Sequence, residues 1–393
     1  MPHSRILFHY TSMTSSILLF LLSPPLLGLW FLALIVLTFS TIYAADPPWK
    51  RPEARQKERD EGAVHVVEAN HAAAFGLVAS CGLLAVWWFP DILVYVSLIL
   101  FGIGSFYGMQ QCLMVIVRSV PSWRIPGSGG MTETIVAAVT VLLWAAVRNT
   151  TQAWIWQDIL GAFTVALILR TLKLPSLRVS CFLLTSAFIY DIFWVFVSSR
   201  FTSNGESIME AAATGSGVTV KETVPMMFRV PVYWAEGGDA YTMLGFGDLV
   251  LPGLLVTLCR EIDGWIGIAP GVRAYAGNAS LFTSIFDYLP SLCISFRWTY
   301  HRVAIAGYGA GLQVTFIAML LTETGQPALL YLVPCTLFPV IFLGWQRGQL
   351  EMMWTGDFKT DGKETDENGG MADEDRGMAN KDGPEEVIEV EIA

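Results

Sequence analysis

Long uninterrupted blocks of apolar residues dominate this chain and constrain its fold more than any other feature. Each block has about twenty residues, the length that an α-helix needs to cross the hydrocarbon core of a bilayer. A soluble domain carries about 25% charged residues, whereas this sequence carries 15%. The sequence therefore predicts an all-α polytopic membrane protein with nine transmembrane helices, near residues 26–44, 72–89, 92–117, 134–147, 153–169, 179–199, 240–259, 303–321 and 326–346.

The first apolar block indicates how the chain enters the membrane. From Ile6 to Ala45 there is no Asp, Glu, Lys or Arg, and this run exceeds the apolar region of roughly 7–15 residues in a cleaved signal peptide. Ile42 is also bulky for the position three residues before a cut after Ala44. We expect an uncleaved first span, with Pro24 and Pro25 breaking the helix at its start.

Positive charges between the spans predict the orientation. The segment after the first span, "KRPEARQKER", carries five Lys and Arg residues, and the loops after the third, fifth and seventh spans are also basic. The alternate loops carry far fewer positive charges for their length. We therefore expect the N-terminus on the luminal or extracellular side and the C-terminus in the cytosol.

Most of the net charge belongs to the C-terminal end. The formal net charge is −10, and residues 355–393 contribute −9 of it, with thirteen acidic and four basic side chains. Such a segment has too little apolar surface to fold. We predict a nine-helix transmembrane domain over residues 1–354 and an acidic, disordered cytosolic tail over residues 355–393.

Two carboxylates lie deep within predicted spans. Asp191 and Asp248 are each eight residues from the expected luminal boundary, or roughly 12 Å at the rise of an α-helix. An ionised carboxylate in hydrocarbon costs at least ~2.5 kcal/mol, and the predicted span interiors hold no Lys or Arg to pair with it. Glu133 and Asp158 lie at predicted span ends, where we expect them to be solvated.

The equal depth of Asp191 and Asp248 is compatible with contact between them. Two carboxylates in contact hold one proton over a wide pH range, because both cannot ionise at low cost. Such a pair suits peptide hydrolysis, in which one carboxylate activates water and the other polarises the scissile carbonyl. Gly245 and Gly247 would let a substrate backbone come close. From the residues alone, a proton or cation site of a transporter is favoured over a protease.

Three short motifs change that balance. Tyr190-Asp191, the "GFGD" of residues 245–248 and the "PAL" of residues 327–329 resemble, in order, the YD, GxGD and PAL motifs of presenilin-type intramembrane aspartyl proteases. The strings "LGFGDLVLPGLL" and "TGQPALLYLVPCTL" are similar to the signal peptide peptidase and signal peptide peptidase-like branch. The resemblance covers roughly residues 70–350.

The resemblance implies an intramembrane aspartic endopeptidase with a presenilin-like fold. Its expected catalytic residues are Asp191 and Asp248, and the residues expected to shape the site are Tyr190, Gly245, Phe246, Gly247, Pro327, Ala328 and Leu329. The expected substrates are transmembrane segments of type II membrane proteins and remnant signal peptides. The expected surroundings are the lipid bilayer of the endomembrane system (ER, Golgi or endolysosome) or the plasma membrane. We predict no cofactor, no metal and no nucleic-acid partner, and leave an oligomer open.

Other protein classes fit the sequence less well. A transporter that uses the two Asp residues is the alternative, although the sequence has no clear internal repeat of the kind many transporters show. The chain lacks the HExxH motif of a zinc protease. His65, Glu68 and His71 do not share one helical face, so we expect a solvated segment there.

The "GYGAG" of residues 307–311 has small residues four apart, which predicts close helix packing.

Overall fold

The fold is described from a computed structural model of the chain. The described residues are 23–45, 60–62, 64–119, 130–150, 152–198, 225–232, 241–266, 298–322 and 326–356. By its contacts the chain divides into Met1–Phe358 and Lys359–Ala393, and all described residues belong to the first unit. The predicted acidic tail beyond Gly356 lies outside the described residues, and so does most of the 263–300 segment.

The described part of the chain is mostly helical, with a helix at each of the nine predicted positions. Six of these segments are long and apolar enough to cross a membrane, so the count of nine spans stays a prediction. The helices are α2 (Pro24–Ala44), α4 (Ala69–Trp88), α5 (Pro90–Ser119), α6 (Met131–Val147), α7 (Ala153–Thr171), α8 (Leu177–Ile192), α10 (Phe246–Trp265), α12 (Tyr300–Thr322), α13 (Ala328–Gln346) and the short α14 (Leu350–Thr355).

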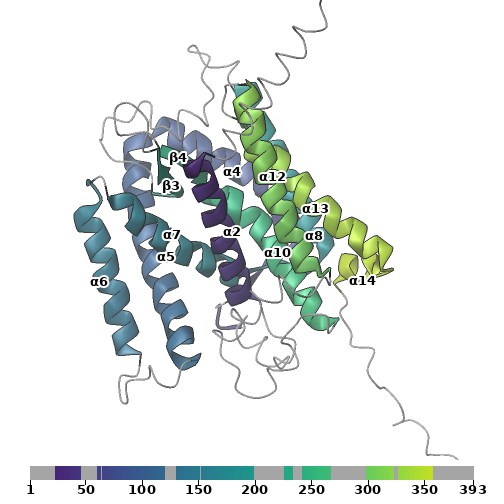
Figure 1. Ribbon diagram of the computed structural model, residues 1–393, viewed down its shortest axis with the longest axis horizontal. Coiled ribbons are helices and arrows are strands. Elements are labelled where there is room, and N and C mark those ends of the chain that lie inside the picture. Colours follow the sequence, from purple (N-terminus) through teal and green to yellow (C-terminus); the bar gives the residue numbers. More distant parts are fainter. Residues whose placement is uncertain are drawn as a thin grey trace, which may run out of the picture. The chain divides into compact units, whose positions relative to one another are not determined.

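Helix α10 forms the centre of the helical packing. It contacts α2, α7, α8, α12 and α13, and Figure 1 shows it running among these helices. Its run Leu254–Leu258 is buried throughout, so the middle of α10 faces protein on all sides. A helix that is apolar all round is typical of the interior of a bundle, and the side chains on α10 are therefore held by packing from several directions.

Two small sheets correct the expectation of an all-α fold. Strands β1 (His65–Val66) and β2 (Leu172–Lys173) pair in parallel, and β3 (Met227–Pro231) and β4 (Tyr241–Gly245) pair antiparallel. The predicted seventh span was expected to begin near residue 240, but the chain is extended there and the helix begins at Phe246. An apolar run of this length does not by itself distinguish a strand from a helix.

Helices α12 and α13 pack closely through the "GYGAG" segment, which confirms the prediction from its small residues. A Cβ atom on Gly307 would lie 2.2 Å from the carbonyl oxygen of Cys335. A Cβ atom on Gly311, one turn later, would lie 3.1 Å from the Cα of Leu332. Only glycine lets the two backbones approach to this distance.

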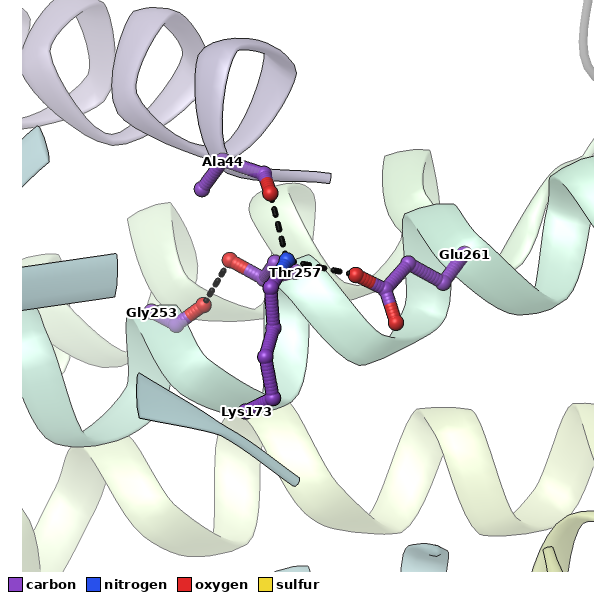
Figure 2. A network of polar contacts seen from close by, with 5 residues as sticks. All are labelled: Ala44, Lys173, Gly253, Thr257 and Glu261. Carbon is purple, nitrogen blue, oxygen red and sulfur yellow. Dashed lines mark hydrogen bonds and ion pairs between the residues drawn. The ribbon is translucent and has the colours of Figure 1, made fainter. Parts of the chain in front are cut away.

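A buried polar network joins the end of α2 to α10 (Figure 2). The ammonium group of Lys173 donates to the carbonyl oxygen of Ala44 and forms an ion pair of 2.6 Å with Glu261. In the next turn back along α10, the Thr257 hydroxyl donates to the Gly253 carbonyl oxygen at 2.9 Å. Lys173 belongs to the basic loop after the fifth predicted span, is 8% exposed and connects three parts of the chain.

Candidate active site

Asp191 lies one residue before the end of α8 and is 1% exposed. A single turn of π-helix, Phe193–Val197, follows directly, and such turns are frequent at functional sites. The carboxylate oxygen Oδ2 accepts a hydrogen bond of 2.9 Å from the backbone N–H of Leu329. Asp191 therefore connects α8 to the first turn of α13, 138 residues further along the chain.

The start of α13 explains why the "PAL" tripeptide meets Asp191. Pro327 is the N-cap residue and has no side-chain cap bond, so the first amides of the helix need acceptors from elsewhere. Asp191 supplies one for Leu329, and the positive end of the helix dipole favours a carboxylate there. Pro327 marks the helix start, and the amide of Leu329 makes the contact with Asp191.

Asp248 is the third residue of α10 and is partly buried. It interacts electrostatically with Asp191, so the structure brings the two predicted catalytic side chains into one site. Residues 241–245 form a strand, so Asp248 lies in the first turn of α10 and not eight residues into a helix. Asp248 therefore lies at a strand-to-helix junction, and Asp191 lies near the end of another helix, α8.

The two glycines beside Asp248 face different surroundings. A Cβ atom on Gly245 would lie 3.3 Å from Oδ2 of Asp248, which is a tight contact. A Cβ atom on Gly247 would meet nothing within 4 Å, and this residue is exposed. Gly245 thus leaves room for the carboxylate itself, while Gly247 leaves open space next to it.

Phe246, the variable residue of the GxGD motif, anchors the junction in the core. Its ring lies 4.7 Å from the ring of Phe228 and 6.1 Å from that of Phe101, measured between centroids. It also occupies a notch at Gly161 of α7, where a Cβ atom would lie 2.5 Å from the ring. Asp248 is therefore two residues from a side chain fixed on three sides.

Two tyrosines flank the pair of carboxylates. Tyr190 packs edge-on against Phe75 of α4, with 6.5 Å between ring centroids, so its ring contacts the neighbouring helix. Tyr308 of α12 is fully buried and interacts electrostatically with Asp248. Its hydroxyl has no hydrogen-bond partner among the described residues. Tyr308 could not be recognised from the sequence, because the "GYGAG" segment indicates only the spacing of its small residues.

Two further residues near the site were also missed. Asp158 was expected to be solvated at a span end, but it is 5% exposed and accepts a hydrogen bond of 3.0 Å from the N–H of Arg229. Its neighbour Gln157 donates to the Met227 carbonyl oxygen at 3.1 Å. Glu133, the other acid expected to be solvated, is 7% exposed. Burial by a distant hairpin leaves no signal in the local sequence of α7.

The arrangement can bind and transfer a proton. One carboxylate is held by a backbone N–H, and a second is near enough to interact with its charge. Within the described ranges, no three His, Cys, Asp or Glu side chains are grouped so that they could hold a metal ion. His65, Glu68 and His71 are exposed, as the sequence predicts. The reactive groups at the site are therefore two carboxyl groups, and they are surrounded mainly by apolar side chains.

The helices and the site define an integral membrane protein with two interacting carboxyl groups among its packed helices. The model of the signal peptide peptidase family matches residues 57–360. The chain belongs to this family, and the family is one of proteases. This finding confirms the resemblance drawn from the three motifs.

Several curated relatives carry the name signal peptide peptidase-like. Signal peptide peptidase-like 5 of Oryza sativa is 35% identical over 309 residues, which are 74% of this chain and 51% of the relative. Signal peptide peptidase-like 2B of Mus musculus is 33% identical over 336 residues, 80% of this chain and 53% of the relative. Signal peptide peptidase-like 3 of Arabidopsis thaliana is 34% identical over 315 residues, which are 76% of this chain and 52% of the relative. The chain spans about half the length of these relatives.

Proposed function

We propose that this protein is an intramembrane aspartyl endopeptidase that hydrolyses peptide bonds with Asp191, Asp248 and a water molecule. The observation that supports this most directly is the electrostatic interaction of the two carboxyl groups, with Asp191 also bound to the amide of Leu329 at 2.9 Å. Family membership independently supports a protease. The open space beside Gly247 would admit the backbone of a substrate.

The proposed reaction uses one proton shared by the pair. The hydrogen bond from Leu329 stabilises negative charge on Asp191, which makes Asp191 the general base. It takes a proton from water while the water oxygen attacks the scissile carbonyl carbon, and Asp248 donates its proton to the carbonyl oxygen. A proton then passes to the leaving nitrogen as the C–N bond breaks. The products are a carboxylic acid and an amine, and one proton remains on the pair.

The proposed substrates are transmembrane segments of type II membrane proteins and remnant signal peptides. The resemblance of the motifs implies this class, and the N-out orientation expected from the basic loops agrees with it. The proposed compartment is the endomembrane system or the plasma membrane. A proton- or cation-coupled transporter is the competing function, and membership in a protease family does not favour it.

The test of the proposed function is cleavage of a type II transmembrane peptide by purified protein, with products read by mass spectrometry. We expect Asp191→Asn and Asp248→Asn each to abolish cleavage, and the double variant to be no worse, because the two residues act as one unit. Asn keeps an oxygen that can accept from Leu329, so the variants should fold. Asp91, in the first turn of α5, provides the matched Asp→Asn control. Full proteolysis by either single variant would reject the pair.

A further inference from the structure

Two adjacent side chains of α7 hold the outer edge of strand β3. The Gln157 amide donates to the carbonyl oxygen of Met227 at 3.1 Å. The Asp158 carboxylate accepts from the N–H of Arg229 at 3.0 Å. Both α7 side chains are buried, at 6% and 5% exposure. Such buried polar groups are costly unless paired. Here the Gln157 amide and the Oδ1 atom of Asp158 are each paired with the backbone of the same strand, while Oδ2 of Asp158 has no hydrogen-bond partner among the described residues.

The register of the hairpin shows which edge is held. The N–H of Phe246 donates to the carbonyl oxygen of Met226 at 3.1 Å, so alternate residues from Met226 onward bond to β4. In an antiparallel pair the residues between them turn their N–H and C=O groups away from the partner strand. Met227 and Arg229 are those residues. Gln157 thus supplies a donor and Asp158 an acceptor in the place of a neighbouring strand.

The same face of α7 also receives the start of α10. Gly161 lies one helical turn after Gln157 and Asp158, so all three share a side of the helix. The ring of Phe246 fills the notch at Gly161 and packs on Phe228, the strand residue between the two held by α7. The hairpin backbone and the aromatic anchor are therefore fixed by one surface.

We propose that Gln157 and Asp158 are positioning residues of the active site. They fix β3 on α7, β3 fixes β4 through the ladder, and β4 continues without a break into Gly245 and the first turn of α10. Asp248 is three residues beyond β4. The pair from α7 touches no reacting atom, and it sets the position of Asp248 through the hairpin. This proposal rests on the proposed function for its catalytic consequence, and its structural part stands apart from it.

The first test removes the acceptor. Asp158→Leu has similar size but leaves the N–H of Arg229 without its partner, so we expect amide hydrogen exchange over residues 225–232 and 241–245 to become roughly tenfold faster. We expect kcat for a type II peptide to fall roughly 10- to 100-fold, as a small displacement of a catalytic group does, with KM changed less than about threefold. Asp158→Asn keeps an acceptor oxygen and should restore both values to within about threefold of wild type.

A second variant and a matched control distinguish a specific effect on the hairpin from a general loss of folding. Gln157→Met keeps the length of the side chain without its donor, and we expect the same changes in the same direction. Thr164 lies on the same helix, and its hydroxyl bonds to Ser105 of α5 at 2.9 Å, away from the hairpin. Thr164→Val should therefore leave exchange and kcat as in wild type. All values are normalised to folded protein from size-exclusion chromatography.

Several results would overturn the proposal. Unchanged hairpin exchange in folded Asp158→Leu or Gln157→Met would show that the bonds do not hold the strand. An Asp158→Asn variant as impaired as Asp158→Leu would show that charge, not the acceptor, matters. Equal losses in Thr164→Val would indicate general loosening of α7. If wild type cleaves no peptide, the proposed function fails, and hydrogen exchange alone decides whether α7 holds the hairpin.

Discussion

At the scale of single residues, the site depends on backbone groups that a motif does not display. Leu329 contributes its N–H to Asp191, and its side chain is buried in the core. The YD, GxGD and PAL motifs indicate the candidate site residues, and the structure brings the three segments that carry these motifs together. Tyr308 and Asp158 could not be found in the same way, because their roles depend on distant segments of the same chain that pack against them. Local sequence carries no record of such partners.

Gly247 offers a sharp test at this scale. We expect Gly247→Ala to fold as well as wild type, because the new Cβ atom meets nothing within 4 Å and alanine favours a helix over glycine by roughly 0.5–1 kcal/mol. We expect kcat/KM for a type II peptide to fall roughly tenfold or more, because the methyl group enters the space beside Asp248. Gly82→Ala in α4 is the matched control, since its Cβ atom also meets nothing within 4 Å. Full activity of Gly247→Ala would remove this residue from the site.

At the scale of elements, apolar length predicted where helices lie but not where the seventh begins. The segment "YTMLG" of residues 241–245 is apolar enough to extend a predicted helix, and in the structure it pairs with β3. The competing partner lies in residues 227–231, beyond the reach of a local pattern. Helix α10 also carries four charged residues, at 248, 260, 261 and 263, which explains why its composition is less typical of a span than that of its neighbours.

The contact of α12 with α13 provides a prediction for a pair of helices. Gly307→Ala would place a Cβ atom 2.2 Å from the backbone oxygen of Cys335, and a backbone atom cannot move aside unless the helix shifts. Overpacking of this kind costs typically about 1–3 kcal/mol, and we expect the melting temperature to fall accordingly. Cleavage should fall as well, since α13 carries Leu329.

Gly104 is the control for that substitution. Its Cβ atom would lie 3.5 Å from Thr164, an ordinary contact, so Gly104→Ala should melt close to wild type. A Gly307→Ala variant that is as stable as Gly104→Ala would contradict the close approach of the two helices. Both melts are measured in the same detergent with the same heating rate.

At the scale of the molecule, the helices are tied together by contacts between distant parts of the chain. Lys173 joins the last residue of α2 to α10 (Figure 2), and Asp263 accepts from the amides of Tyr300 and His301 at 2.9 and 2.8 Å. The sequence assigned Lys173 to a basic loop from its charge alone. Charge pattern can suggest a side of the membrane, whereas the partners of a charge depend on the packed fold.

The Lys173 network predicts a loss of stability when one partner is removed. Lys173→Met leaves the Glu261 carboxylate and the Ala44 carbonyl oxygen without the ammonium group, and breaking a buried ion pair typically costs ~3–5 kcal/mol. We expect a value near 3 kcal/mol, because Glu261 is partly exposed. Adding Glu261→Leu should recover part of that loss, because no uncompensated charge then remains. Chemical denaturation in detergent measures the free energy of unfolding of the single and the double variant. A Lys173→Met variant with wild-type stability would contradict the role of the network.

The orientation of the whole molecule is open to a glycosylation test. The sequon Asn149-Thr150-Thr151 follows α6, and its asparagine is exposed. The basic loops predict a luminal position for it, so Asn149 should carry glycan in a eukaryotic cell, with incomplete occupancy because α7 begins at Ala153. The sequon at Asn278 lies outside the described residues, and the same charges predict that it faces the cytosol and stays bare. Glycosidase treatment of wild type, Asn149→Gln and Asn278→Gln, followed by gel mobility, separates the cases. A shift that depends on Asn278 would reverse the predicted orientation, and with it the match to type II substrates.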